Sequence, residues 1–113
     1  MISMEKILEQ TLLYDFYGEL LTEHQKQIYE DVVLNDYSFS EVASEQGISR
    51  QGVHDLIKRC SKILQEYESK LHLVEKFVTI KSQIEEMEAS LRGTEQPDRE
   101  ALIRKLNDIL ENL

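Results

Sequence analysis

Seven side chains between Ser49 and Lys62 carry the groups that proteins use to bind nucleic acids. Arginine, glutamine and histidine, which stand at positions 50, 51 and 54, can hydrogen-bond to the edges of bases. Serine, lysine and arginine side chains are suited to phosphate oxygens. At helical spacing these side chains point outward, away from Val53. We therefore predict base contacts from Arg50, Gln51 and His54, and phosphate contacts from Ser49, Lys58, Arg59 and Lys62.

The segment around these side chains has the pattern of two helices joined by a tight turn. Ser38 and Glu41 form a capping-box pattern where the first helix would begin. Gly47 stands where the turn needs a positive φ angle, and Ser49 can cap the second helix. The side chains expected between the two helices are apolar: Val42, Ile48, Val53 and either Leu56 or Ile57. This pattern is typical of a helix-turn-helix unit, whose second helix usually enters the major groove of DNA.

The charge of the chain opposes a polyanion everywhere except near this segment. The 113 residues carry a net charge of −9. Residues 1–47 hold two basic and ten acidic side chains, whereas residues 48–83 hold seven basic and four acidic ones. The basic stretch therefore begins at the predicted recognition helix. The acidic residues in the rest of the chain weaken non-specific attraction to nucleic acid. An equally simple interpretation of these acidic residues is that they keep the protein soluble.

The composition favours an all-α protein. With only four glycines and one proline, long helices are favoured over a turn-rich β fold. The single cysteine, Cys60, excludes an internal disulfide and fits a reducing compartment. The sequence shows no leader, no lipidation signal and no apolar run of about 18 residues. We therefore expect a cytoplasmic protein with no membrane insertion.

Two helices are predicted ahead of the motif. The first covers residues 4–16, and Gly18 interrupts it. Thr22 and Gln25 form a capping box for the second, which extends to about Leu34 and is followed by a turn at residues 35–37. The side chains expected in the core are Ile7, Leu8, Leu12 and one of Tyr14 or Phe16 from the first helix, and Ile28, Val32 and one of Val33 or Leu34 from the second.

Apolar residues recur at heptad spacing after the motif, and no proline or glycine occurs between Val53 and Arg92. The apolar stripe shifts by one residue along the way, which indicates either one long drifting helix or, as we favour, a break near residues 69–73. Residues 93–97 interrupt the chain again, with Pro97 suited to the first turn of a last helix. We divide the chain into a head (residues 1–68) and a helical extension (residues 69–113) within one structural unit. The extension has more apolar surface than a folded-back hairpin buries, so we predict a homodimer over a purely intramolecular core.

The head resembles region 4 of bacterial sigma factors over about residues 20–65. The matching segments are Leu21-Thr-Glu-His-Gln-Lys-Gln-Ile-Tyr, Ser40-Glu-Val-Ala and Gly47-Ile-Ser-Arg-Gln-Gly-Val. Nearly the whole chain is similar to the YlxM helix-turn-helix proteins of Gram-positive bacteria, as in Leu12-Leu-Tyr-Asp-Phe-Tyr-Gly-Glu-Leu-Leu-Thr and Ser49-Arg-Gln-Gly-Val-His-Asp. That resemblance implies an all-α, sigma-region-4-like protein, usually encoded beside the GTPase of the signal recognition particle. It also implies a suggested regulatory role in that targeting pathway.

Two functions stay open. Compared with sigma region 4, Gly52 and His54 replace larger or more basic side chains, and Asp55 adds a carboxylate that repels phosphate. In the first function the protein is a regulator that binds nucleic acid, either DNA or the RNA of the signal recognition particle. In the second it is an adaptor whose acidic head binds a basic partner, such as the methionine-rich RNA-binding domain of the particle's GTPase.

No catalytic site is predicted. Glu68, His72 and Glu75 share a helical face, but such a set is more typical of solvated charge pairs than of metal ligands. Cys60 falls on the apolar stripe, which favours a buried side chain over a nucleophile. There is no glycine-rich phosphate loop. We expect neither an enzyme nor a bound cofactor or metal.

Overall fold

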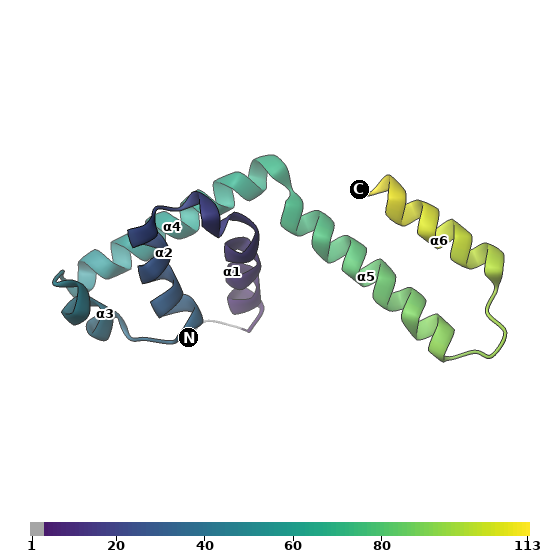
Figure 1. Cartoon of the computed structure of the whole chain (residues 1–113), viewed down its shortest axis with the longest axis horizontal. Helices are drawn as coiled ribbons and strands as arrows, with labels where there is room; N and C mark the ends of the chain where they lie inside the picture. Colours follow the sequence, from purple (N-terminus) through teal and green to yellow (C-terminus); the bar gives the residue numbers. More distant parts are fainter. Residues whose placement is uncertain (1–3) are drawn as a thin grey trace. The chain divides into compact units, whose positions relative to one another are not determined.

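The computed structural model describes residues 4–113, and it confirms the all-α prediction (Figure 1). Six α-helices and no strand occur in this part of the chain. The chain divides into two compact units, unit 1 (Met1–Leu71) and unit 2 (His72–Leu113). None of the helices from residue 4 onward is long and apolar enough to cross a lipid bilayer.

Unit 1 contains four α-helices whose packing centres on α4. The helices are α1 (Met4–Tyr17), α2 (Glu23–Tyr29), α3 (Phe39–Gln46) and α4 (Arg50–Leu71). A short 3-10 turn, η1 (Gly18–Leu20), follows α1, and a π-helical segment, η2 (Glu30–Leu34), continues α2. Helix α4 packs against each of the other three helices. The second helix therefore extends to Leu34 as predicted, although its last five residues are π-helical.

The core of unit 1 joins the helix-turn-helix motif to α2. The fully or nearly fully buried side chains here are Ile28, Val42, Ala43 and Val53. Partly buried apolar side chains pack around them: Val32, Phe39, Leu56 and Ile57. These positions confirm most of the predicted core of the motif. The exception is Ile48, which is 38% exposed because it lies in the turn itself, beyond the end of α3.

Tyrosines attach α1 to the rest of unit 1. The Tyr17 hydroxyl donates a hydrogen bond to Oε1 of Glu68 on α4 at 2.6 Å, and the Tyr14 hydroxyl donates one to Glu30. The Tyr14 ring stacks on Tyr29 with centroids 5.4 Å apart. Burial, followed by the hydrogen bond and the charge of Glu30, raises the pKa of Tyr14 well above its ordinary value.

The predicted buried side of α1 is only partly confirmed, by Leu12 and Tyr14, which are half-buried. Ile7, Leu8 and Phe16 are exposed, whereas Leu13 and Tyr17 are buried. Apolar residues occur on several sides of this helix, so spacing alone does not identify the buried one. The tyrosines decide the orientation because their rings bury apolar area while their hydroxyls reach carboxylates.

The predicted N-terminal caps of unit 1 are present. Thr22 Oγ1 accepts a hydrogen bond from the Gln25 backbone N–H, and the Gln25 side chain accepts one from the Thr22 N–H at 2.9 Å, which completes the capping box. Ser38 Oγ accepts from the Glu41 N–H at 3.1 Å. The predicted second capping box is otherwise incomplete: the Glu41 carboxylate accepts a hydrogen bond from the Ser38 hydroxyl and not from the Ser38 backbone N–H.

Unit 2 is a hairpin of α5 (Leu73–Arg92) and α6 (Arg99–Glu111), which run antiparallel and pack together (Figure 1). His72 adopts a left-handed conformation with φ of 55°, so the predicted break within residues 69–73 is confirmed. Asp98 caps α6 by accepting from the N–H groups of Glu100 and Ala101. Pro97 therefore precedes the cap, and its predicted place in the first helical turn is wrong because the Asp98 carboxylate makes the better cap.

Candidate nucleic-acid interface

The turn between α3 and α4 sets the direction of the candidate recognition helix. Gly47 has φ of 68° and ψ of 30°, the left-handed conformation that glycine adopts at little cost. Its N–H donates to the carbonyl of Ala43, which closes the end of α3. Ser49 Oγ then accepts from the Gly52 N–H at 2.9 Å and so caps α4. The chain thus forms the predicted helix-turn-helix, with α4 as its second helix.

The three side chains predicted to contact bases lie together at the start of α4. Arg50, Gln51 and His54 are exposed, and all three line a shallow hollow of about 510 Å³. Phe39 of α3 forms the remaining wall, and its ring meets the His54 imidazole edge-on with centroids 5.7 Å apart. The prediction omitted Phe39 because nothing in the linear spacing shows that the first turn of α3 borders this surface.

Asp55 lies among the predicted base-contacting groups. Its Oδ1 accepts a hydrogen bond from Nε2 of Gln51 at 2.9 Å. The same oxygen lies 3.7 Å from Nδ1 of His54, an ion pair when the imidazole is protonated. The carboxylate therefore occupies donor groups that would otherwise be available to a base, and it places a negative charge beside the hollow.

Two of the four predicted phosphate contacts lie further along α4, beside α1. Lys58 and Lys62 line a groove of about 410 Å³ together with Lys6, which stands in the first part of α1. The sequence prediction missed Lys6 because it lies more than 50 positions earlier and reaches the groove only through the packing of α1 on α4. Arg59 is exposed but lines neither hollow, and Ser49 acts as the cap of α4.

The four basic side chains that the sequence predicted for this surface, all from α4, lack carboxylate partners in the part of the chain that the structure describes. No ion pair there includes Arg50, Lys58, Arg59 or Lys62. By contrast, Lys26 contacts Glu19 at 2.9 Å and Glu23 at 3.6 Å, so its charge is neutralised locally. The positive potential of α4 is therefore available to an outside anion.

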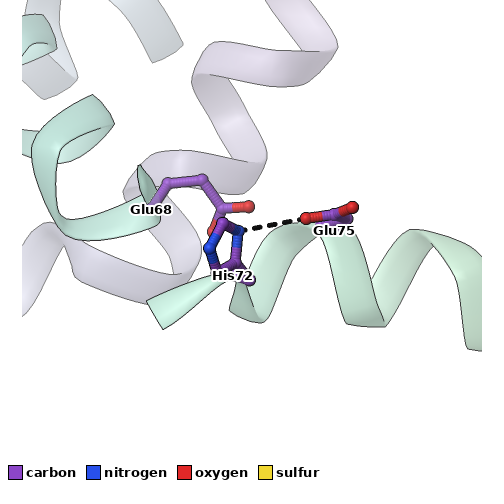
Figure 2. Close-up of side chains that lie close together, drawn as sticks. All are labelled: Glu68, His72 and Glu75. Atoms are coloured by element: carbon purple, nitrogen blue, oxygen red, sulfur yellow. Dashed lines mark ion pairs between the residues drawn. The ribbon is translucent and has the colours of Figure 1, made fainter. Parts of the chain in front are cut away.

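The residues considered for catalysis or metal binding make the following contacts. Nδ1 of His72 lies 3.1 Å from Oε2 of Glu75 in the first turn of α5, the ion pair dashed in Figure 2. Glu68 belongs to unit 1, where it accepts the hydrogen bond from Tyr17. Cys60 is fully buried, and burial raises the pKa of its thiol, which disfavours the reactive thiolate.

Comparison with known proteins identifies the family. Residues 4–111 match the UPF0122 family, described as YlxM / p13 like helix-turn-helix proteins. A UPF0122 protein of Lactococcus lactis is 39% identical over 108 residues, covering 96% of this chain and 93% of the relative. Another, from Thermoanaerobacter, is 39% identical over 102 residues, covering 90% and 87%. A third, from Acetivibrio thermocellus, is 49% identical over 79 residues, covering 70% and 68%. The family description names a helix-turn-helix protein and no catalytic activity, and this chain belongs to that YlxM/p13-like family.

Proposed function

We propose that this protein is a cytoplasmic regulator that binds nucleic acid through the outer surface of α4, from Ser49 to Lys62. The observation that carries the proposal is the single hollow shared by Arg50, Gln51 and His54 at the start of a capped helix. The groups that can hydrogen-bond to base edges therefore lie together. Lys58 and Lys62 lie further along α4, where the phosphate backbone of a bound nucleic acid would continue.

Binding by this surface combines attraction at close range with repulsion from the rest of the molecule. Lys58, Arg59 and Lys62 of α4 contact phosphates and release counterions, so affinity falls as salt rises. The acidic residues 1–47 repel a polyanion that approaches in any other orientation. Such a protein binds weakly to random nucleic acid and depends on a matching site for its affinity.

The proposed pathway is protein targeting by the signal recognition particle. The support is the resemblance to YlxM proteins, now extended by a family match over nearly the whole chain. The nucleic acid is either the RNA of the particle or promoter DNA, and the particle's GTPase is a candidate protein partner. The regulator acts as a homodimer, as the apolar stripe of the extension favours.

The proposal is tested by fluorescence anisotropy of labelled signal recognition particle RNA, titrated with this protein in the presence and absence of the particle's GTPase. Random duplex DNA serves as the reference. Arg50→Ala and Lys58→Ala should each weaken binding, whereas Arg104→Ala, an exposed arginine of unit 2, should leave it unchanged. Equal affinities for wild type, Arg50→Ala and Lys58→Ala would contradict the proposed surface.

A second function, protein adaptor, has one observation in its favour. The first 47 residues carry a net charge of −8, which suits a basic protein partner. Part of that charge is already engaged, because Glu30 accepts a hydrogen bond from Tyr14 and Glu23 lies 3.6 Å from Nζ of Lys26. Charge reversal at Glu23, Glu30 and Asp31 should then abolish a complex with the GTPase. Failure to detect any complex at low salt would exclude this function.

A further inference from the structure

The hairpin of unit 2 exposes an apolar stripe on each of its two helices. On α5 the stripe consists of Phe77, Ile84 and Leu91, which are seven residues apart, and they are 40%, 52% and 45% exposed. On α6 it consists of Ile103, Leu106 and Leu110, and Leu113 continues it just beyond the end of the helix; the spacings are three, four and three residues, with 50–74% exposure. Both patterns are the heptad spacing of a helix-packing seam.

The two stripes lie on the same side of the hairpin. The helices are in contact, and the partly or fully buried side chains, Ile80 and Met87 on α5 and Leu102 and Ile109 on α6, indicate the sides that face one another. Each stripe contains residues that follow these facing residues by four positions: Ile84 and Leu91 on α5, and Leu106 on α6. Four residues turn an α-helix by about 400°, so each stripe is rotated by about 40° or more from the side that faces the other helix, in the same sense along the chain. Because α5 and α6 are antiparallel, rotation in the same sense brings both stripes to one face.

This face, which we call the hairpin face, is large for the surface of a monomer. Its seven side chains leave on the order of 600–800 Å² exposed, against about 300–600 Å² for the largest apolar patch of a typical monomer and about 800 Å² per partner in a stable interface. We propose that two copies of the chain pair through their hairpin faces to form an antiparallel four-helix bundle. The inference rests on the self-pairing stated in the proposed function and supplies its interface.

One two-fold axis aligns both stripes. An axis crossing α5 at Ile84 places Phe77 opposite Leu91 of the second copy, because both lie seven residues from Ile84. The same axis crosses α6 near Leu106 and places Ile103 opposite the second copy's Leu110. These centres lie at similar heights in the hairpin, since Ile84 is eight residues before the end of α5 and Leu106 is seven after the start of α6.

The charges beside the stripe are complementary under this axis. Lys81 and Glu88 border the α5 stripe on the same side, one heptad apart, and their side chains are 63% and 56% exposed. The axis at Ile84 brings Lys81 of one copy beside Glu88 of the other, twice per dimer. Parallel pairing of α5 would instead place Lys81 beside Lys76 of the second copy, a like-charged contact made twice per dimer. Charge complementarity therefore selects a second, antiparallel copy as the occupant of the hairpin face.

Sedimentation equilibrium of the full chain tests the interface. Wild type should dimerise, and Ile84→Glu/Leu106→Glu should raise the dissociation constant by more than about 100-fold, because the variant would bury unpaired carboxylates. The matched control is Ser82→Glu/Arg104→Gln, which makes the same change in charge outside the stripes and should dimerise normally. Far-UV circular dichroism checks that all variants keep their helices. A monomeric wild type, or a dimer that persists in Ile84→Glu/Leu106→Glu, would overturn the inference.

A charge exchange tests the register. Lys81→Glu and Glu88→Lys should each weaken the dimer by about 3–10-fold through two like-charge contacts, and the double variant should restore it. Restored dimerisation in the double variant could not come from contacts within one chain. Lys81 pairs with Glu85 and Glu88 pairs with Arg92, and both of these pairs become repulsive in the double variant. Additive weakening would overturn the antiparallel register. RNA and DNA binding are measured separately, so failure of the nucleic-acid proposal is distinguishable from failure of this one.

Discussion

The two units differ in how they dispose of apolar surface. Unit 1 encloses its own core, in which Ile28, Val42, Val53, Cys60 and Leu64 are all fully buried. In unit 2 the buried apolar side chains are Val74 and Ile109, and a larger number of apolar side chains is exposed along both helices. Three helices packed on a fourth can surround a core, whereas a two-helix hairpin can cover only one side of each helix. The difference indicates that unit 1 carries the candidate binding surface on a self-sufficient scaffold, while unit 2 is suited to assembly.

The largest expected contrast comes from one truncation in each unit. Ile28→Ala should lower the free energy of unfolding by about 2–5 kcal/mol, because it removes fully buried atoms and leaves a cavity in the core. Ile84→Ala, at a side chain that is 52% exposed, should cost about 0.5 kcal/mol in the monomer. Urea unfolding of dilute protein measures both. Similar losses in the two variants would remove the distinction between the units.

A glycine from each unit gives the next largest contrast. Gly47→Ala should destabilise by about 1–2 kcal/mol, because alanine must then adopt φ of 68°, although no atom within 4 Å obstructs its Cβ. Gly93 at the end of α5 has φ of −85°, which alanine adopts readily. Its Cβ would lie 3.3 Å from the carbonyl oxygen of Ala89, so Gly93→Ala should destabilise by about 0.5 kcal/mol, less than Gly47→Ala. Thermal unfolding of both variants is the measurement. A neutral Gly47→Ala would show that the turn is not held in its left-handed conformation.

The titration of tyrosine and cysteine side chains at alkaline pH should act on unit 1 alone, since unit 2 contains neither residue type. Burial raises the pKa values of Tyr14, Tyr29 and Cys60, and in Tyr14 the Glu30 carboxylate adds to this effect. A pKa raised in the folded state means that stability is fully present below the unfolded pKa and declines as pH rises. Unfolding by denaturant should therefore become easier above about pH 9–10. Tyr14→Phe should flatten this decline, and an identical pH dependence in Tyr14→Phe would contradict the assignment.

The smallest expected effect concerns the candidate binding surface. Asp55→Asn removes a negative charge beside Arg50, Gln51 and His54, so it should tighten nucleic-acid binding by about 2–5-fold. Glu85→Gln makes the same change on unit 2 and should leave the affinity unaltered. Anisotropy titrations at fixed salt compare the two. Equal effects would mean that only net charge matters and that α4 is not the binding surface.

The sequence predicted those features that depend on neighbours in the chain. The Thr22 capping box and the left-handed Gly47 follow from residue types a few positions apart, and the break near His72 follows from the shift of the apolar stripe along the chain. The buried side of α1 followed only in part, because its orientation depends on hydrogen bonds from tyrosines to carboxylates on other helical segments. Ile48 was predicted inside from its place in the helix-turn-helix pattern, although the turn places it at the surface.

The same distinction applies to the candidate site. Helical spacing alone indicated that Arg50, Gln51 and His54 share one exposed surface, and in the structure they line one hollow. Phe39 and Lys6 were missed because they reach α4 through tertiary packing. That the hollow binds nucleic acid stays a prediction.

The central claim, that α4 binds nucleic acid through its own phosphate contacts, is tested most directly by the salt dependence of the affinity for signal recognition particle RNA and for duplex DNA. Lys58→Ala/Lys62→Ala should reduce the slope of log Kd against log salt by about 2, one for each lost contact. Lys76→Ala/Arg104→Ala removes two exposed charges from unit 2 and should leave the slope unchanged. A slope equal to that of wild type in Lys58→Ala/Lys62→Ala, or no binding to either nucleic acid, would contradict the account.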